Sequence, residues 1–301
     1  MTFTISLKEE ISKKDFNINE SLYELEGFIK CCAKIKKEII LTLENASVAR
    51  KIYRDIKRVF NISCNVTVRN QKRFRVKQIY ILTIKENINI IKERLNLNQI
   101  ESSIVTDEEK IAFLQGAFLA IGNVSNPQTS GYHLEFICSN EKLGKYIVKL
   151  LQDFSFNAKL ITRGYKFIVY LKASEQISDL IKMFKANQAL YFFEDVRIYR
   201  DHKNMVNRLN NCEISNQTKA LATGQKQIKQ IAFLEENGLI ELVDDKTKTV
   251  IEARKKYPES SLVELAEIIS LEYNYKIGKS GVNHHFIKID NMIKNYKKNN
   301  E

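Results

Sequence analysis

Two nine-residue stretches decide the fold: Leu114-Gln115-Gly116-Ala117-Phe118-Leu119-Ala120-Ile121-Gly122 and Leu25-Glu26-Gly27-Phe28-Ile29-Lys30-Cys31-Cys32-Ala33. Each lies in a helix-like segment and carries one interior glycine, Gly116 or Gly27. A glycine inside a helix costs about 1 kcal/mol relative to alanine, so something must offset that cost at both positions. Close approach of two helices is the simplest offset, and chance glycines are the alternative. The pattern predicts two motif helices that pack against each other.

The segments that follow the two stretches match each other in order. After the first stretch we expect a strand at 37–45, a helix at 47–60, strands at 62–69 and 73–84, and a helix near 87–97. After the second we expect a loop at 123–131, a strand at 132–138, a helix at 140–154, strands at 157–163 and 166–172, and a helix near 174–185. An order that repeats after about 90 residues indicates a duplicated α+β unit, not a solenoid of short repeats.

Composition narrows the class of protein. A chain of 301 residues with 44% hydrophobic residues can form sizeable cores, in two domains or in one duplicated domain plus a small one. The formal net charge of +12 favours a polyanionic partner, and nucleic acid is the commonest one. A lysine-rich composition without functional meaning is the alternative.

Cysteine content and hydropathy bear on the compartment. The cysteines are odd in number and no C-x-x-C pair occurs, which argues against a disulfide framework or a zinc cluster and fits a reducing compartment. The first residues, MTFTISLKEEISKK, contain no apolar core of a signal peptide. No apolar run approaches the roughly 18 residues needed to span a bilayer. We therefore expect a cytoplasmic protein without membrane attachment.

The last third of the sequence is helical in pattern. After a polar, Asn-rich joint at 201–218, one helix is expected to end at Asn237-Gly238 and a second to run near 245–257. Ser261 and Glu264 form a capping-box pattern that opens a short helix. Ser280 is the expected cap of a final helix.

The packed face of that final helix consists of four apolar residues: Val282, Phe286, Ile289 and Ile293. A short helix, a connection and a longer helix with a polar first turn match the helix-turn-helix plan. The connection, Leu271–Gly278, is longer than the usual tight turn. A plain helical bundle is the alternative.

The paired stretches, one in each half, resemble the LAGLIDADG homing-endonuclease motif. Three further segments resemble the WhiA family more specifically: Asn123-Val124-Ser125 with a proline-containing loop before Tyr132-His133-Leu134-Glu135, Asn207-Arg208-Leu209 through Asn211-Cys212-Glu213, and Lys279-Ser280-Gly281-Val282-Asn283-His284. The resemblance covers nearly the whole chain. It implies an α+β fold of tandem LAGLIDADG-like repeats, followed by an all-α helix-turn-helix domain. The implied bounds are 1–98 and 99–200 for the two halves, 201–218 for a linker and 219–301 for the helical domain.

The resemblance also implies a function. WhiA-like proteins are bacterial DNA-binding regulators that act on transcription and on cell division or chromosome segregation, with sporulation genes as targets in some relatives. The implied partner is double-stranded DNA, bound by a monomer associated with the nucleoid, and the LAGLIDADG-like domain offers a surface for other proteins. One alternative is a protein-interaction scaffold with weak DNA binding. Another is an active homing endonuclease or maturase.

The residues argue against nuclease activity. Active LAGLIDADG relatives carry an acid at the eighth motif position of each helix, and the two acids hold Mg²⁺ at the scissile phosphate. Cys32 and Ile121 occupy those positions here, and neither supplies a hard oxygen ligand. The neighbours His284 and His285 point about 100° apart on a helix and cannot chelate one ion together. We therefore predict no catalytic residue, no metal and no cofactor.

Two surfaces are candidates for DNA contact. The first is the helix-turn-helix at 260–294, with the residues Lys276, Lys279, Ser280, Asn283, His284, His285 and Lys288. The second is one face of the strand pair in the first half, with Arg69, Arg73, Arg75 and Lys77. A two-stranded ribbon fits the major groove, but the same face is equally consistent with a solvated surface or a protein docking surface.

Overall fold

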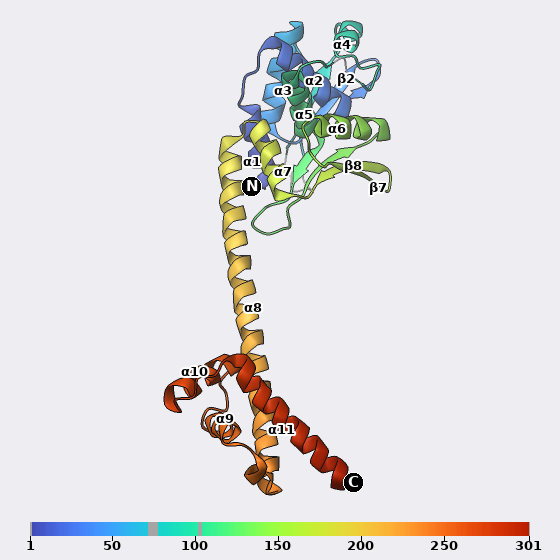
Figure 1. Cartoon of the computed structure of the whole chain (residues 1–301). Coiled ribbons are helices and arrows are strands. Elements are labelled where there is room, and N and C mark those ends of the chain that lie inside the picture. The colour runs from blue at the N-terminus through green and yellow to red at the C-terminus, as the bar shows by residue number, and fades with distance from the viewer. Residues whose placement is uncertain (1, 72–77, 102–103, 301) are drawn as a thin grey trace. The chain divides into compact units, whose positions relative to one another are not determined.

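A computed structural model of the chain describes residues 2–71, 78–101 and 104–300. The chain divides into two compact units, Met1–Arg200 and Asp201–Glu301 (Figure 1). The first unit mixes helices with sheets, and the described part of the second is helical. The predicted α+β fold followed by an all-α module is therefore confirmed.

The two halves of the first unit repeat one topology. The first half consists of α1 (Phe3–Ser12), α2 (Ile18–Cys32), β1 (Lys34–Ile35), β2 (Ile39–Leu43), α3 (Ala46–Phe60), β3 (Asn65–Asn70), β4 (Gln78–Ile84) and α4 (Ile88–Arg94). The second half consists of α5 (Asp107–Ile121), β5 (Gly122–Val124), β6 (Leu134–Cys138), α6 (Glu141–Asp153), β7 (Lys159–Arg163), β8 (Lys166–Leu171) and α7 (Ser174–Met183). Among the described residues the antiparallel sheets have the strand orders β1-β2-β4-β3 and β5-β6-β8-β7. The predicted duplication is confirmed.

Strands β1 and β5, helix α1 and the first turns of α8 (Asn187–Glu236) were not expected from the sequence. The expected loop at 123–131 begins with strand residues, because β5 follows the motif helix directly and pairs Gly122 with Phe136 of β6. Three residues are too few to carry a readable alternation pattern, which is why this edge strand was missed. Helix α1 was not predicted, although Phe3, Leu7 and Ile11 recur at helical spacing and are all buried.

Helix α1 joins the start of the chain to the rest of the first unit. The Glu10 carboxylate accepts hydrogen bonds from the backbone amides of Gln188 and Ala189, each at 2.8 Å, and so caps the first turn of α8 (Asn187–Glu236). Phe3 stacks on Phe192 with ring centroids 5.7 Å apart. These contacts fix α1 against the beginning of α8.

A buried ion cluster links α2 to α3. Lys51 Nζ lies 2.9 Å from Glu24 Oε2 and 3.2 Å from Asp55 Oδ2, and it also donates to the carbonyl oxygen of Lys14 at 3.1 Å. All three charged side chains are buried. Burial raises the pKa of Glu24 to about 7, and the attraction of Lys51 offsets that rise only in part.

The second unit contains the rest of α8 together with η1 (Leu239–Leu242), α9 (Asp245–Lys256), α10 (Leu262–Glu272) and α11 (Lys279–Asn300). Residues 201–218, expected as a polar joint, lie inside α8. Helix α8 ends at Glu236, and Gly238 follows in the left-handed conformation, as predicted. The capping box of Ser261 and Glu264 at the start of α10 is also confirmed.

The core of this unit confirms the predicted packed face of α11. Val282, Phe286 and Ile289 are buried, and Ile293 packs against the same cluster. The predicted cap at Ser280 is wrong. The helix begins at Lys279, and the amide of Val282 already donates to the carbonyl oxygen of Gly278 at 3.1 Å. The Ser280 side chain therefore lies in the first turn, where it is exposed.

No helix in the part of the chain that the structure describes is both long enough and apolar enough to cross a bilayer.

Candidate nucleic-acid interface

The motif helices α2 and α5 pack together through their two glycines. A Cβ atom built on Gly116 would lie 2.8 Å from the carbonyl carbon of Glu24 and closer still to its oxygen. A Cβ atom built on Gly27 would meet the carbonyl group of Phe113 in the same way, 2.9 Å from its carbon. Each glycine thus admits the backbone of the other helix, and the predicted close approach is confirmed (Figure 1).

The ends of these two helices do not offer a Mg²⁺ site. The Cys32 thiol donates to the carbonyl oxygen of Phe28 at 3.3 Å, and burial raises its pKa to about 12, so it stays protonated. Ile121 is a half-buried hydrocarbon. Among the described residues, no group of three or more His, Cys, Asp or Glu side chains could hold a metal ion. The residues at the two motif positions therefore do not fit the metal that active LAGLIDADG relatives use.

A lysine from α1 reaches the same region. The Lys8 ammonium lies 5.7 Å from the centroid of the Phe118 ring, in the last turn of α5, and it interacts electrostatically with Cys32 at the end of α2. Burial lowers the pKa of Lys8 to about 8, and the Glu44 carboxylate offsets part of that shift. A positive side chain next to Cys32 opposes the binding of a divalent cation at the ends of the motif helices.

The sheet face predicted to contact DNA lies largely outside the described residues. Arg73, Arg75 and Lys77 belong to that part of the chain. Arg69 lies on β3, at the edge of its sheet, and its side chain is exposed. Its role in DNA contact stays a prediction.

The helix-turn-helix region contains α10, the connection at residues 273–278 and α11. The connection is held to α10, since the amide of Ile277 donates to the Ser270 hydroxyl at 3.3 Å and Asn274 adopts a left-handed conformation. The buried faces of α10 and α11 pack on α9 and on the last turns of α8. This packing fixes which side of α11 faces solvent.

Six of the seven predicted contact residues are exposed, and Lys288 is one of them. The other five exposed residues lie together where α11 begins: Lys276, Lys279, Ser280, Asn283 and His284. They occupy the end of the connection and the first turns of α11, where the free backbone amides and the helix dipole favour an anion such as a phosphate group. The amide of Asn283 and the ring of His284 can donate and accept hydrogen bonds at base edges.

The other two predicted contact residues have partners inside the protein. The half-buried His285 ring lies between Thr247 Oγ1 at 2.8 Å and the Tyr275 hydroxyl at 3.4 Å, and burial lowers its pKa. Lys288 Nζ donates to Asp244 Oδ1 at 2.7 Å, and this contact holds the pKa of Asp244 well below its usual range. His285 and Lys288 thus attach α11 to the start of α9, and DNA contact by either stays a prediction.

Sequence reasoning missed two residues that shape this unit. Arg254 is fully buried, and its guanidinium donates to the carbonyl oxygens of Tyr257 at 3.2 Å and Ser260 at 2.6 Å. Gly224 of α8 admits the carbonyl group of Pro258. Together they hold the segment before α10 against α8. An arginine in an otherwise charged helix gives no sequence signal of burial.

Family models match the chain in three consecutive parts. The WhiA N-terminal LAGLIDADG-like domain matches residues 19–98, the WhiA LAGLIDADG-like domain matches residues 110–203, and the WhiA C-terminal HTH domain matches residues 206–293. A Probable cell division protein WhiA from Staphylococcus aureus (strain NCTC 8325 / PS 47) is 35% identical to the chain, over 97% of the chain and 96% of that relative. The protein of the same name from strain COL is equally similar.

Two solved structures resemble the chain in fold. The crystal structure of full-length DUF199/WhiA from Thermatoga maritima covers 98% of this chain and 99% of its own, with a TM-score of 0.57 and 22% sequence identity. The N-terminal LAGLIDADG domain of DUF199/WhiA covers 61% of this chain and 92% of its own, with a TM-score of 0.50 and 24% identity. At such identities the similarity shows the fold alone.

Proposed function

Since the chain belongs to the WhiA family, we propose that it is a non-catalytic DNA-binding regulator of transcription that acts in cell division and chromosome segregation. Its helix-turn-helix domain makes double-stranded DNA the expected partner, which would associate the protein with the nucleoid. The observation that carries the proposal is the exposed first part of α11, where Lys279, Asn283 and His284 project from a helix held by a buried face.

The reading mechanism follows from the chemistry of these side chains. An asparagine can bond adenine through two atoms in the major groove, and a lysine can reach guanine or a phosphate group. The first turn of α11 would hold a backbone phosphate and set the position of the helix without reading sequence. Asn283 and His284, one turn further along, would then read base edges.

The test is a titration of the full chain against two kinds of DNA. A preferred duplex is first selected from a random-sequence library, and its affinity is compared with that of a scrambled duplex at one fixed salt concentration. Asn283→Ala should weaken binding to the preferred duplex by about 5-fold to 150-fold, which corresponds to about 1–3 kcal/mol, and should change binding to the scrambled duplex little.

A matched control is Asn291→Ala, which removes the same exposed side chain two turns further along α11. It should leave the ratio of the two affinities unchanged. Circular dichroism should show that all variants stay folded. If Asn283→Ala and His284→Ala both leave the ratio unchanged, α11 does not read the sequence and this mechanism is wrong.

A second candidate role concerns the first unit. Strand β3 lies at a sheet edge, and its Val66 and Val68 are 50% and 49% exposed. Exposed apolar residues on an unpaired edge favour a protein partner over a DNA backbone. The LAGLIDADG-like unit would then serve as a scaffold for protein docking while the second unit binds DNA.

A further inference from the structure

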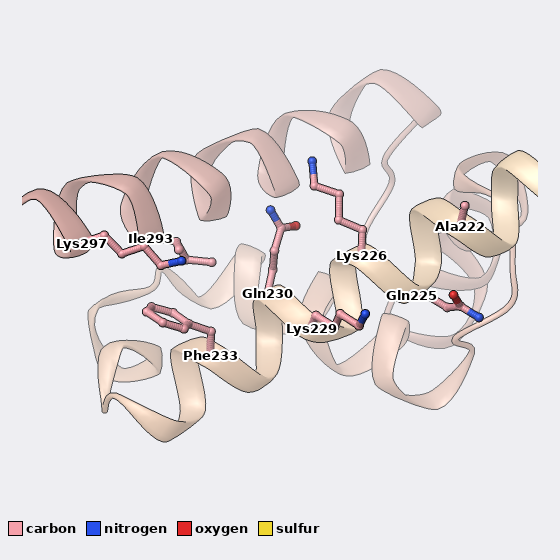
Figure 2. A pocket seen from close by; sticks show the side chains of 8 residues that line it. All are labelled: Ala222, Gln225, Lys226, Lys229, Gln230, Phe233, Ile293 and Lys297. Atoms are coloured by element: carbon pink, nitrogen blue, oxygen red, sulfur yellow. The ribbon is translucent and has the colours of Figure 1, made fainter.

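The second unit carries a basic groove that the helix-turn-helix plan does not use. It lies between the last turns of α8 and the last turns of α11 and has a volume of about 400 Å³. Figure 2 shows the side chains that line it: Ala222, Gln225, Lys226, Lys229, Gln230, Phe233, Ile293 and Lys297. Phe233 and Ile293 form its apolar floor, and three lysines lie around it (Figure 2).

The three lysines lie outside the salt bridges found in the described part of the chain. Lys226, Lys229 and Lys297 form no ion pair within 4.0 Å among the residues that the structure describes. The nearby Asp290 already accepts from Gln230 and pairs with Lys294, both at 2.6 Å. Asp290 also attracts Lys226, but the described residues that line the groove include three lysines and no acid. The groove therefore keeps a net positive charge, which a negatively charged partner complements.

One of the three lysines, Lys297, contacts the aromatic ring at the floor of the groove. Lys297 Nζ lies 5.2 Å from the centroid of the Phe233 ring, whose edge is met by Tyr296. Lys226 and Lys229 are one helical turn apart on α8 and are both exposed. Lysine ammonium groups on flexible stems bind phosphate oxygens as point charges and do not require a fixed geometry. This chemistry suits the phosphates of a nucleic-acid backbone and carries no base preference.

The position of the groove separates it from the sequence-reading turn. Lys297 follows Asn283 by fourteen residues on one helix, which corresponds to about 21 Å along its axis. A recognition helix contacts base edges with its N-terminal residues, so the last turns of α11 lie well away from the residues that would read the bases. Lys294 and Lys298 continue the same basic track on the described surface of α11.

We propose that the α8–α11 groove binds the phosphate backbone of DNA outside the major groove read by α11. The proposal rests on the proposed DNA-binding function and adds a second contact surface to it. The second surface would raise affinity for any sequence and would lengthen the DNA segment that one molecule occupies. It would not change which sequence is preferred.

The experiment measures the salt dependence of DNA binding by the full chain. The triple variant Lys226→Gln, Lys229→Gln, Lys297→Gln is compared with the native protein on a scrambled 40-base-pair duplex over a series of salt concentrations. Each lost phosphate contact lowers the slope of log affinity against log salt by about 0.9, so the triple variant should lose about 2 to 3 from the slope. The ratio of affinities for preferred and scrambled DNA should stay unchanged.

The matched control removes the same charge from α9 of the same unit. This control is the triple variant Lys248→Gln, Lys255→Gln, Lys256→Gln. In the native protein these three lysines pair with acids. The control therefore loses the same charge as the first variant but leaves the lysines of the groove in place. Its slope should stay within about 0.5 of the native slope, since no phosphate contact worth about 0.9 is removed. Equal slopes in the two triple variants would overturn the proposal and leave an acidic protein as the partner of the groove. If the native chain does not bind DNA, the proposed function itself fails.

Discussion

Replacing the glycines at the crossing of α2 and α5 with alanine should destabilise the first unit, although each substitution adds only one carbon atom. In Gly116→Ala the added Cβ would lie 2.8 Å from the Glu24 carbonyl carbon and 3.0 Å from the Phe28 amide nitrogen. Cβ atoms seldom approach other heavy atoms closer than 3.4 Å. The obstacle is the backbone of a helix, so no side-chain rotation relieves it and the two helices must separate.

The magnitude follows from two opposing effects. Overpacking in a tight core costs about 1–3 kcal/mol, and a rigid backbone obstacle places this case at the upper end of that range. The replacement of glycine by alanine inside a helix returns about 1 kcal/mol. The net loss of unfolding free energy should be about 2 kcal/mol for Gly116→Ala and similar for Gly27→Ala. The double variant should lose less than the sum, because one separation of the helices relieves both contacts.

Urea unfolding followed by circular dichroism measures the loss, and hydrogen exchange in α2 and α5 assigns it to the crossing. The matched control is Gly144→Ala in α6, where the closest atom to the new Cβ is the end of the flexible Leu160 side chain at 2.9 Å. That variant should be unchanged or stabilised by up to about 1 kcal/mol. Equal stability of Gly116→Ala and Gly144→Ala would refute the argument that backbone contact at the crossing requires glycine.

Two further predictions concern the same unit. The pKa of Glu24 is raised to about 7, so the folded state retains a proton that the unfolded chain releases near pH 4.5, and stability should fall as the pH rises through this interval. Glu24→Gln should make the free energy of unfolding depend less on pH over this interval. The prediction is contradicted if the variant and the native protein differ in unfolding free energy by the same amount at every pH from 4.5 to 8. Cys32 and Ile121 supply no oxygen ligand, so supercoiled plasmid that carries the selected site should stay uncut in the presence of Mg²⁺ or Mn²⁺. Specific cleavage by repurified protein would exclude the non-catalytic assignment.

Much of the fold could be read from local patterns. The strand and helix order of both halves follows from hydrophobic periodicity, and Gly27 and Gly116 were identified because a helix-interior glycine needs a physical reason. The WhiA resemblance carried by the motif segments is confirmed by the family models. The buried face of α11 was predictable for a similar reason, since Val282, Phe286 and Ile289 repeat at helical spacing.

The parts that could not be predicted depend on contacts between distant residues. Residues 201–218 are exposed and rich in asparagine, yet they continue a helix whose flanking turns are packed. His285 and Lys288 have sequence positions suited to DNA, and only the folded unit shows that Thr247 and Asp244 engage them. Arg254 is a charged residue in a polar segment, so nothing local marks it as buried.

The two ends of the motif helices show how a nuclease scaffold and a binding protein can share one backbone. The glycine crossing is a packing requirement, because α2 and α5 form the central contact of the first unit whether or not a metal is bound. Acids at positions 32 and 121 would contribute to metal binding and not to the packing of the helices. Two carboxylates side by side would also repel each other unless a cation lay between them. A thiol at Cys32 and a hydrocarbon at Ile121 remove that repulsion, while Lys8 brings a positive charge of the protein's own to the end of α2. A chain without acids at positions 32 and 121 is therefore compatible with an intact scaffold.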